Sequence, residues 1–147
     1  MHPWESEYRN PKFITLGTEP ISDVKEFMKW IKKQARKNPQ DFSAPVVDWT
    51  VLDLGCGNGK NLKYIVENFC ETGIGYDISE TAINMAQELS SGINIKYETR
   101  SIGEVFPLVD QSVDLIIDAT SSHALSFVER QVYLSEIARV LKPGGFM

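Results

Sequence analysis

Two carboxylates and a glycine-rich turn are the residues of this sequence best suited to chemistry. The turn, residues 55–59, follows a short apolar run that contains Asp53. Glycine tolerates positive φ and has no Cβ, so a ligand can come close to the backbone of such a turn. The second carboxylate, Asp77, ends the next apolar segment, where a side chain of this type can accept hydrogen bonds from both hydroxyls of a ribose. Together these residues predict a nucleoside-binding site.

A strand, a helix and a second strand must bring these residues together. Residues 51–54 form a short apolar run around one carboxylate, which is typical of a fully buried parallel strand. Residues 60–68 carry apolar side chains at spacings of three and four, which predicts a helix. Residues 73–76 predict the second strand, which Asp77 closes. The unit is a strand–helix–strand crossover, right-handed by the usual rule.

The rest of the chain repeats this alternation. Helices are expected from Ser79 to about residue 90 and from 127 to 141, and strands over 93–99 and 112–119. A Pro-Gly-Gly sequence at 143–145 is expected to end the last helix. Short strands alternating with amphipathic helices predict an α/β fold with a parallel sheet covered by helices on both faces.

The first 45 residues have a different character. Residues 1–20 contain several large apolar side chains without a sustained period, which predicts an ordered arm. Residues 22–37 predict an amphipathic helix whose polar face is rich in lysine and arginine. That face is either a solvated surface or a contact for an acidic protein or RNA. We therefore expect residues 1–45 to pack on a sheet domain formed by residues 46–147.

Composition restricts the class of protein. A chain of 147 residues with 42% hydrophobic content can bury one sizeable core, and its net charge of −5 argues against nucleic acid as the main partner. Two cysteines are too few for a disulfide framework or zinc spacing, so we expect a reduced cytoplasmic location and no metal site. The chain also has neither an export signal nor an apolar run of about 18 residues, so no membrane association is expected.

Four segments in order resemble the class I S-adenosylmethionine (SAM)-dependent methyltransferases, in the group of small bacterial-type domains. They are DLGCGNG at 53–59, GYDIS at 75–79, FP followed by VDLII between 106 and 117, and RVLKPGG at 139–145. The resemblance covers about residues 46–147. The main rival is a nicotinamide-dependent oxidoreductase, whose fingerprint needs a third glycine where this sequence has Lys60.

The resemblance implies SAM as the cofactor and assigns roles to the residues at the strand ends. The turn beneath the methionyl and ribose parts is expected to consist of Gly55, Cys56, Gly57 and Gly59. Asp53 is expected to anchor this turn and the methionyl ammonium, directly or through water.

The remaining binding residues follow the second, third and fourth strands. Asp77 is expected to bind the ribose hydroxyls, and Ile78 to lie against the adenine. Asp118 would face the methionyl end or the acceptor. After the third strand the family commonly has an acidic residue that accepts a hydrogen bond from the adenine amino group. Here Ser101 and Ile102 stand in that stretch, which implies a weaker, neutral hydrogen bond and an apolar contact.

Catalysis itself needs few residues, because the sulfonium of SAM is already an activated methyl donor. His123 lies in the loop expected to face the acceptor and could act as a base, or it could be structural. Trp4 and Tyr8 could form an aromatic lid or pack against the sheet. The expected function is methyl transfer to an unidentified small-molecule or protein acceptor. The alternative is a SAM-binding or scaffolding subunit without catalysis of its own.

By analogy with the family, the expected strand order is 3-2-1-4. Family members continue past the Pro-Gly-Gly sequence with a fifth strand, and this chain is expected to stop before it. The fourth strand would then have an unpaired, apolar edge. Such an edge is a template for pairing, so association of two copies through the fourth strand is a further expectation.

Overall fold

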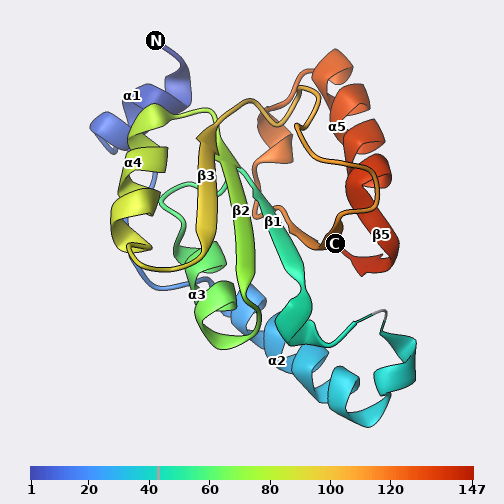
Figure 1. Ribbon diagram of the computed structural model, residues 1–147. Coiled ribbons are helices and arrows are strands. Elements are labelled where there is room, and N and C mark those ends of the chain that lie inside the picture. The colour runs from blue at the N-terminus through green and yellow to red at the C-terminus, as the bar shows by residue number, and fades with distance from the viewer. Residues whose placement is uncertain (43) are drawn as a thin grey trace.

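The computed structural model describes residues 1–42 and 44–147, and its centre is a parallel five-stranded sheet (Figure 1). The strands lie side by side in the order β3-β2-β1-β4-β5. They are β1 (Thr50–Leu54), β2 (Thr72–Asp77), β3 (Ile95–Thr99), β4 (Val113–Ile117) and β5 (Leu141–Phe146). The α/β fold and the order 3-2-1-4 are confirmed, with one strand added at the end.

The fifth strand corrects the expected end of the sheet. β5 pairs in parallel with β4, with Val113 opposite Leu141 and Leu115 opposite Phe146. Because β4 also pairs with β1, it has no free edge, and the expected association of two copies through it is wrong. The sequence pattern did not predict this strand because it contains Pro-Gly-Gly at 143–145, and proline and glycine are depleted in strands. Here they occupy an irregular stretch of the ladder in which Gly144 has a φ of 79°.

Five α-helices surround the sheet in the described part of the chain. They are α1 (Pro3–Arg9), α2 (Ser22–Lys37), α3 (Lys60–Asn68), α4 (Glu80–Leu89) and α5 (Phe127–Val140). Single 3₁₀ turns cover Pro39–Asp41, Val46–Asp48 and Ser122–Ala124. All but α1 were expected, and the expected cap of α4 is confirmed, since the Ser79 hydroxyl accepts a hydrogen bond from the Ala82 N–H. The seven residues of α1 are too few to show a helical period, so the sequence pattern predicted an ordered arm without a helix.

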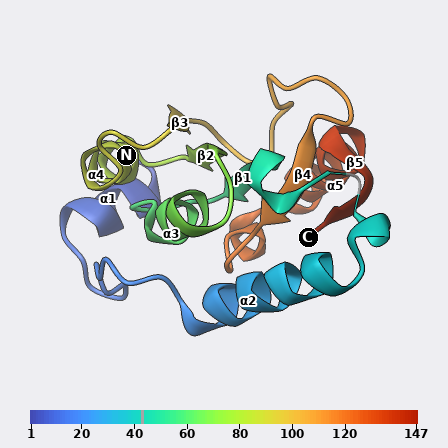
Figure 2. The same cartoon turned by 60° about the horizontal axis from the view of Figure 1, so that its bottom comes forward.

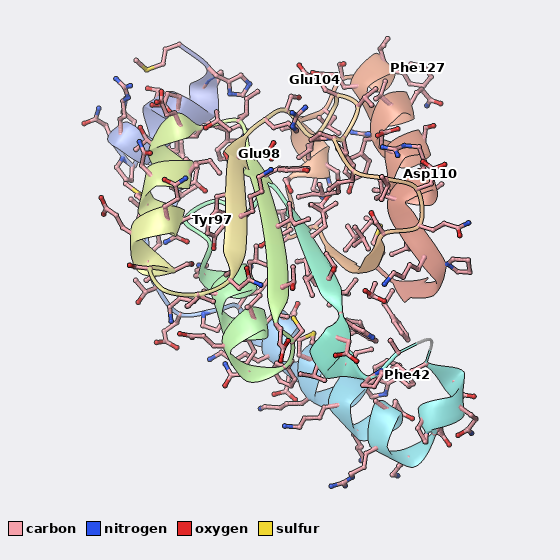
Figure 3. All side chains as sticks on the ribbon, viewed as in Figure 1. Phe42, Tyr97, Glu98, Glu104, Asp110 and Phe127 are labelled. Carbon is pink, nitrogen blue, oxygen red and sulfur yellow. The ribbon has the colours of Figure 1, made fainter. Side chains whose placement is uncertain are left out.

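The helices cover both faces of the sheet, as expected. Successive residues of a strand point to opposite faces. Val51 of β1 therefore packs with α2, α3 and α4, whereas Leu52 and Leu54 pack with α5. Figure 2 shows α2 and α3 together beneath one face of the sheet. Tyr97 of β3 points toward α4 (Figure 3). Its hydroxyl lies 2.8 Å from that of Ser90, the residue that follows α4.

The N-terminal part contacts the rest of the molecule in two places. Val24, Met28 and Ile31 of α2 are buried in the same core cluster as β1. The short helix α1 lies beside α4 (Figure 1). The division of the chain after residue 45 stays a prediction. Each helix formed by residues 1–42 and 44–147 is too short or too polar to cross a bilayer.

Candidate functional site

A cavity of about 220 Å³ opens at the carboxyl ends of the strands. Each of the four strands β1 to β4 is followed by residues that line it: Gly55 after β1, Asp77 and Ile78 at the end of β2, Ser101 and Ile102 after β3, and Ala119, Thr120 and Ser121 after β4. Open parallel sheets bind ligands outside these ends, where the strand order reverses. In this sheet the reversal lies between β1 and β4, which is where the cavity is found.

Asp77 joins the glycine turn to the start of α4. Its Oδ2 accepts a hydrogen bond from the Gly57 N–H, and its Oδ1 accepts one from the Ser79 N–H, both at 2.9 Å. Burial raises the pKa of this carboxyl, although these hydrogen bonds act in the opposite direction. Each carboxylate oxygen has a second lone pair. Asp77 can therefore hold the turn and still accept a hydrogen bond from a ligand hydroxyl.

Asp53 lies in β1, outside the described cavity lining, and one of its carboxylate oxygens is unsatisfied. The side chain is 1% exposed, and its Oδ2 has no hydrogen-bond partner in the described part of the chain. Burial, followed by the charges of Asp77 and Asp118, raises its pKa to about 8. A buried polar atom without a partner is rare and calls for an explanation. A positively charged group of a ligand would satisfy this oxygen and favour its ionised form.

The glycine turn is fixed by the protein itself. The N–H groups of Gly55 and Cys56 both donate to the Tyr76 carbonyl, at 2.8 and 2.9 Å. Gly57 has a φ of 54°, and a Cβ there would overlap the hydroxyl of Tyr8. The glycines were expected because a ligand must come close. The structure adds that protein side chains also approach them, including Tyr97 at Gly59.

Cys56 belongs to this turn, and its side chain is buried and outside the described cavity lining. Burial raises the pKa of its thiol well above the ordinary value, and the charges of Asp53 and Asp77 act in the same direction. The thiol is therefore neutral at physiological pH. Its sulfur donates to the Gly57 carbonyl at 3.7 Å, so Cys56 contributes to the turn rather than to nucleophilic chemistry.

Asp118 organises the loop after β4. Its Oδ1 accepts hydrogen bonds from the Ser121 N–H at 2.8 Å and the Ser121 hydroxyl at 2.6 Å, and its Oδ2 accepts one from the Tyr133 hydroxyl. Burial pushes the pKa of Asp118 upward, but the hydrogen bonds from Ser121 and Tyr133 outweigh it and hold the pKa below its ordinary value. Asp118 thus shapes the wall at Ser121. The described cavity lining does not include Asp118 itself.

His123 lies beside the cavity and is exposed. It belongs to the 3₁₀ turn Ser122–Ala124, and the cavity lining among the described residues includes Ala124 but not His123. A role for His123 as a base stays a prediction. The described residues contain no group of three or more histidine, cysteine or acidic side chains arranged to hold a metal ion.

The N-terminal segment supplies a wall of the cavity that the sequence indicated only in part. His2, Trp4, Tyr8 and Ile14 all line the cavity. For Trp4 and Tyr8, this agrees with the aromatic-lid interpretation. His2 and Ile14 carried no signal, because α1 is too short to show a period and no motif places this segment over the sheet. Burial raises the pKa of Tyr8, and the charges of Asp77, Cys56 and Asp53 add to this rise, so its hydroxyl stays protonated.

The sequence matches a known protein family and known relatives. The methyltransferase domain family matches residues 51–145. The fatty-acid O-methyltransferase of Mycolicibacterium smegmatis is 30% identical over 97 residues, which is 65% of this chain and 34% of that protein. The chain thus spans about a third of the length of this relative.

Solved structures share the fold. A methyltransferase in complex with the Haloferax volcanii Trm112 methyltransferase activator has a TM-score of 0.68 and 21% identity, covering 99% of this chain and 59% of that chain. Phosphoethanolamine N-methyltransferase 1 of Haemonchus contortus, in complex with phosphoethanolamine and S-adenosylhomocysteine, has a TM-score of 0.67 and 20% identity, covering 95% and 28%. At these identities the likeness shows the fold alone.

The family match covers most of the chain, and the strand order and strand-end cavity are those expected from the sequence resemblance. The protein therefore belongs to the class I SAM-dependent methyltransferase family, through its methyltransferase domain.

Proposed function

We propose that this chain binds SAM in the cavity at the strand ends and transfers its methyl group to a small-molecule or protein acceptor. The observation that carries the proposal is the position of Asp77. Its carboxylate lines the cavity, and hydrogen bonds from Gly57 and Ser79 fix its orientation. A carboxylate held in this way at the end of the second strand suits the two hydroxyls of a ribose.

The rest of the cavity fits the other parts of SAM. Ile78, Ser101 and Ile102 surround the position expected for the adenine. Asp53 is not part of the described cavity lining, but its buried, unpartnered Oδ2 suits the methionyl ammonium, directly or through water. The fit thus pairs an apolar wall with the base and a buried carboxylate with the cation.

The residues of the site would position the cofactor and exclude water. When bound, SAM supplies a methyl group on a sulfonium, which needs an aligned nucleophile more than acid or base catalysis. Trp4 and Tyr8 would shield the cavity from solvent on the side of α1. If the acceptor carries a proton, His123, which lies in the loop after β4, would remove it. Such a step would require the loop that carries His123 to turn toward the acceptor.

A second candidate is a SAM-binding or scaffolding role without catalysis. It is favoured by the place of His123 outside the described cavity lining. Binding of SAM without transfer of its methyl group would distinguish this role from the first.

We also propose a cytoplasmic location, since both cysteines are free and buried, as is usual in a reducing compartment. Small-molecule and protein acceptors are favoured over nucleic acid because the net charge of −5 disfavours a phosphate backbone.

Methyl-labelled SAM tests the proposal. The protein would be incubated with the labelled compound and with separated small-molecule and protein fractions of a lysate. Label transferred to one fraction by the wild type, and lost with Asp53→Asn, is the expected result. Label that binds but is never transferred would favour the scaffolding role. Absence of binding would contradict both.

A further inference from the structure

Glu5 of α1 accepts hydrogen bonds from residues at the N-terminus of α4. Its Oε2 accepts hydrogen bonds from the Ser79 hydroxyl at 2.6 Å and the Thr81 N–H at 3.1 Å. Its Oε1 accepts one from the Thr81 hydroxyl at 2.6 Å and one from Arg9 Nε at 2.7 Å. The hydrogen bonds from Ser79 and then Thr81 lower the pKa of Glu5 to about 2. The charged carboxylate also lies at a helix N-terminus, where negative charge is stabilised.

These hydrogen bonds reach the proposed ribose site through one residue. The Ser79 side chain donates to Glu5, and the Ser79 backbone N–H donates to Asp77 Oδ1 at 2.9 Å. Asp77 in turn accepts from the Gly57 N–H. Ser79 is fully buried between them. The position of α1 is therefore coupled to the carboxylate of Asp77 and to the glycine turn.

The segment held by Glu5 forms one wall of the cavity. His2, Trp4 and Tyr8 of this segment line it, and Tyr8 places its hydroxyl over Gly57. A second carboxylate, Glu7, folds the chain after α1. Its Oε1 accepts from the N–H groups of Lys12, Phe13 and Ile14 at 2.6, 2.5 and 3.1 Å, which brings Ile14 to the same wall.

With this wall in place the cavity is small. Its volume of about 220 Å³ lies below the roughly 300–1,000 Å³ usual for ligand pockets. The strands of the sheet are joined by backbone ladders, whereas the hydrogen bonds described between α1 and α4 are all made by the Glu5 side chain. Entry of a ligand as large as SAM would therefore require α1 to move outward and then close again.

We propose that residues 2–14 form a cover that closes over bound SAM. Glu5 is the positioning residue, because its hydrogen bond with Ser79 fixes where the closed cover lies relative to Asp77. The inference rests on the proposed function. It goes beyond that function by assigning the N-terminal segment to cofactor retention and by naming the contact that fixes it.

The dissociation rate of the product measures the cover directly. In Glu5→Gln, an NH₂ group replaces one of the two carboxylate oxygens. This group cannot accept hydrogen bonds from Ser79 and Thr81, so the contact with α4 is weakened. S-adenosylhomocysteine should dissociate roughly tenfold faster from this variant, because charge-assisted hydrogen bonds of this kind are lost. The association rate should rise as well, because the same contact holds α1 closed before the ligand enters. Thr81→Val weakens the same contact from the side of α4 and should shift the rate in the same direction.

Stopped-flow displacement gives the rates, and hydrogen exchange gives the location. In the wild type, S-adenosylhomocysteine should slow exchange in a peptide that covers residues 1–14, and in Glu5→Gln this protection should be lost. Glu80→Gln is the matched control, because it removes an exposed carboxylate from the same turn of α4. Thermal melts establish that each variant is folded.

The outcomes separate the two proposals. Binding to the wild type, weaker binding to Asp77→Asn, and fast dissociation only in Glu5→Gln and Thr81→Val would support the cover. If both of these variants match Glu80→Gln in dissociation rate and in exchange, the cover is wrong while the SAM site stands. If the wild type does not bind S-adenosylhomocysteine, the proposed function fails and the cover fails with it.

Discussion

At the scale of residues, the proposed site depends on two carboxylates that differ in burial and in hydrogen bonding. Asp77 accepts two backbone hydrogen bonds and faces the cavity, whereas Asp53 is buried with an unpartnered oxygen. In the proposed function, the first accepts hydrogen bonds from ribose hydroxyl groups and the second pairs with the methionyl ammonium of SAM.

The strand-end residues of the site could be predicted from the sequence because each follows a recognisable buried strand. Asp77, Ile78, Ser101 and Ile102 line the cavity as expected. The roles assigned to them toward SAM stay predictions. Asp118 was placed at the right strand end, but its oxygens are used by Ser121 and Tyr133. Hydrogen bonds within a loop cannot be predicted from the pattern of residue types.

Substitution of Gly57 should separate backbone strain from contact. Gly57→Ala puts a Cβ at a φ of 54° and against the Tyr8 hydroxyl, so it should lower both stability and SAM affinity. Gly92→Ala is the control, because Gly92 has a φ of 82° in open space. It should cost roughly 1–2 kcal/mol of stability and leave affinity unchanged.

Tyr8→Phe should partly restore binding in the Gly57→Ala background, since it removes the overlapping hydroxyl. Calorimetric titration with S-adenosylhomocysteine and denaturant unfolding measure the two effects. Equal affinity in Gly57→Ala and Gly92→Ala would show that the turn is not at the ligand.

At the scale of elements, β5 is the strand that the sequence pattern missed. The helix before it was predicted nearly to its last residue, since α5 ends at Val140. The Pro-Gly-Gly sequence then predicted a stop, because it disfavours any regular element. Long-range pairing with β4 overrides this local preference. Part of that pairing is stabilised by side chains far apart in the sequence.

Lys142 of β5 forms an ion pair with Asp114 of the neighbouring strand β4. Its Nζ lies 2.9 and 2.8 Å from the two carboxylate oxygens of Asp114 in β4, and Asp114 also accepts from the Thr50 N–H of β1 at 2.9 Å. Asp114 is 2% exposed. Lys142→Met should leave this buried charge without its partner and lower the free energy of unfolding by roughly 1–3 kcal/mol.

Lys96→Met is the matched control for Lys142→Met. Lys96 also pairs with a carboxylate, Glu98, but its side chain is 74% exposed. Its loss should change the free energy of unfolding by less than about 1 kcal/mol. Guanidinium unfolding compares the two variants. Equal losses would mean that the contact with Asp114 does not stabilise the sheet.

At the scale of the whole molecule, the buried Asp53 should make stability depend on pH. Its folded pKa of about 8 is far above the value of about 3.9 expected in the unfolded chain. Its contribution to stability is therefore fully present below about pH 4 and is lost as the pH rises toward 8. Up to about 1.4 kcal/mol per pH unit can be lost in this range.

Asp53→Asn should flatten this dependence between pH 5 and 8. The carboxyls with lowered pKa, such as Glu5, act below this range, and both histidines are present in each variant. Asp48→Asn, at an exposed carboxylate, is the control and should keep the wild-type slope. Unfolding by guanidinium at several pH values measures the slopes. Parallel profiles for Asp53→Asn and the wild type would contradict the raised pKa.

The fold as a whole was more predictable than the completed site. Four strands, their order and four helices follow from hydrophobic periodicity and the family resemblance. The wall formed by His2, Trp4 and Tyr8 depends on where a seven-residue helix packs, and that is decided by contacts of Glu5 with Ser79 and Thr81, over 70 positions away. Such contacts cannot be read from a local pattern.

Calorimetric titration of the wild type and Asp77→Asn with S-adenosylhomocysteine tests the central claim most directly. The wild type should bind one molecule per chain. Asp77→Asn should bind more weakly by roughly 1.5–3 kcal/mol, the range for hydrogen bonds to a charged group. Absence of binding to the wild type, or equal affinity of the two proteins, would contradict the assignment of this cavity as the SAM site.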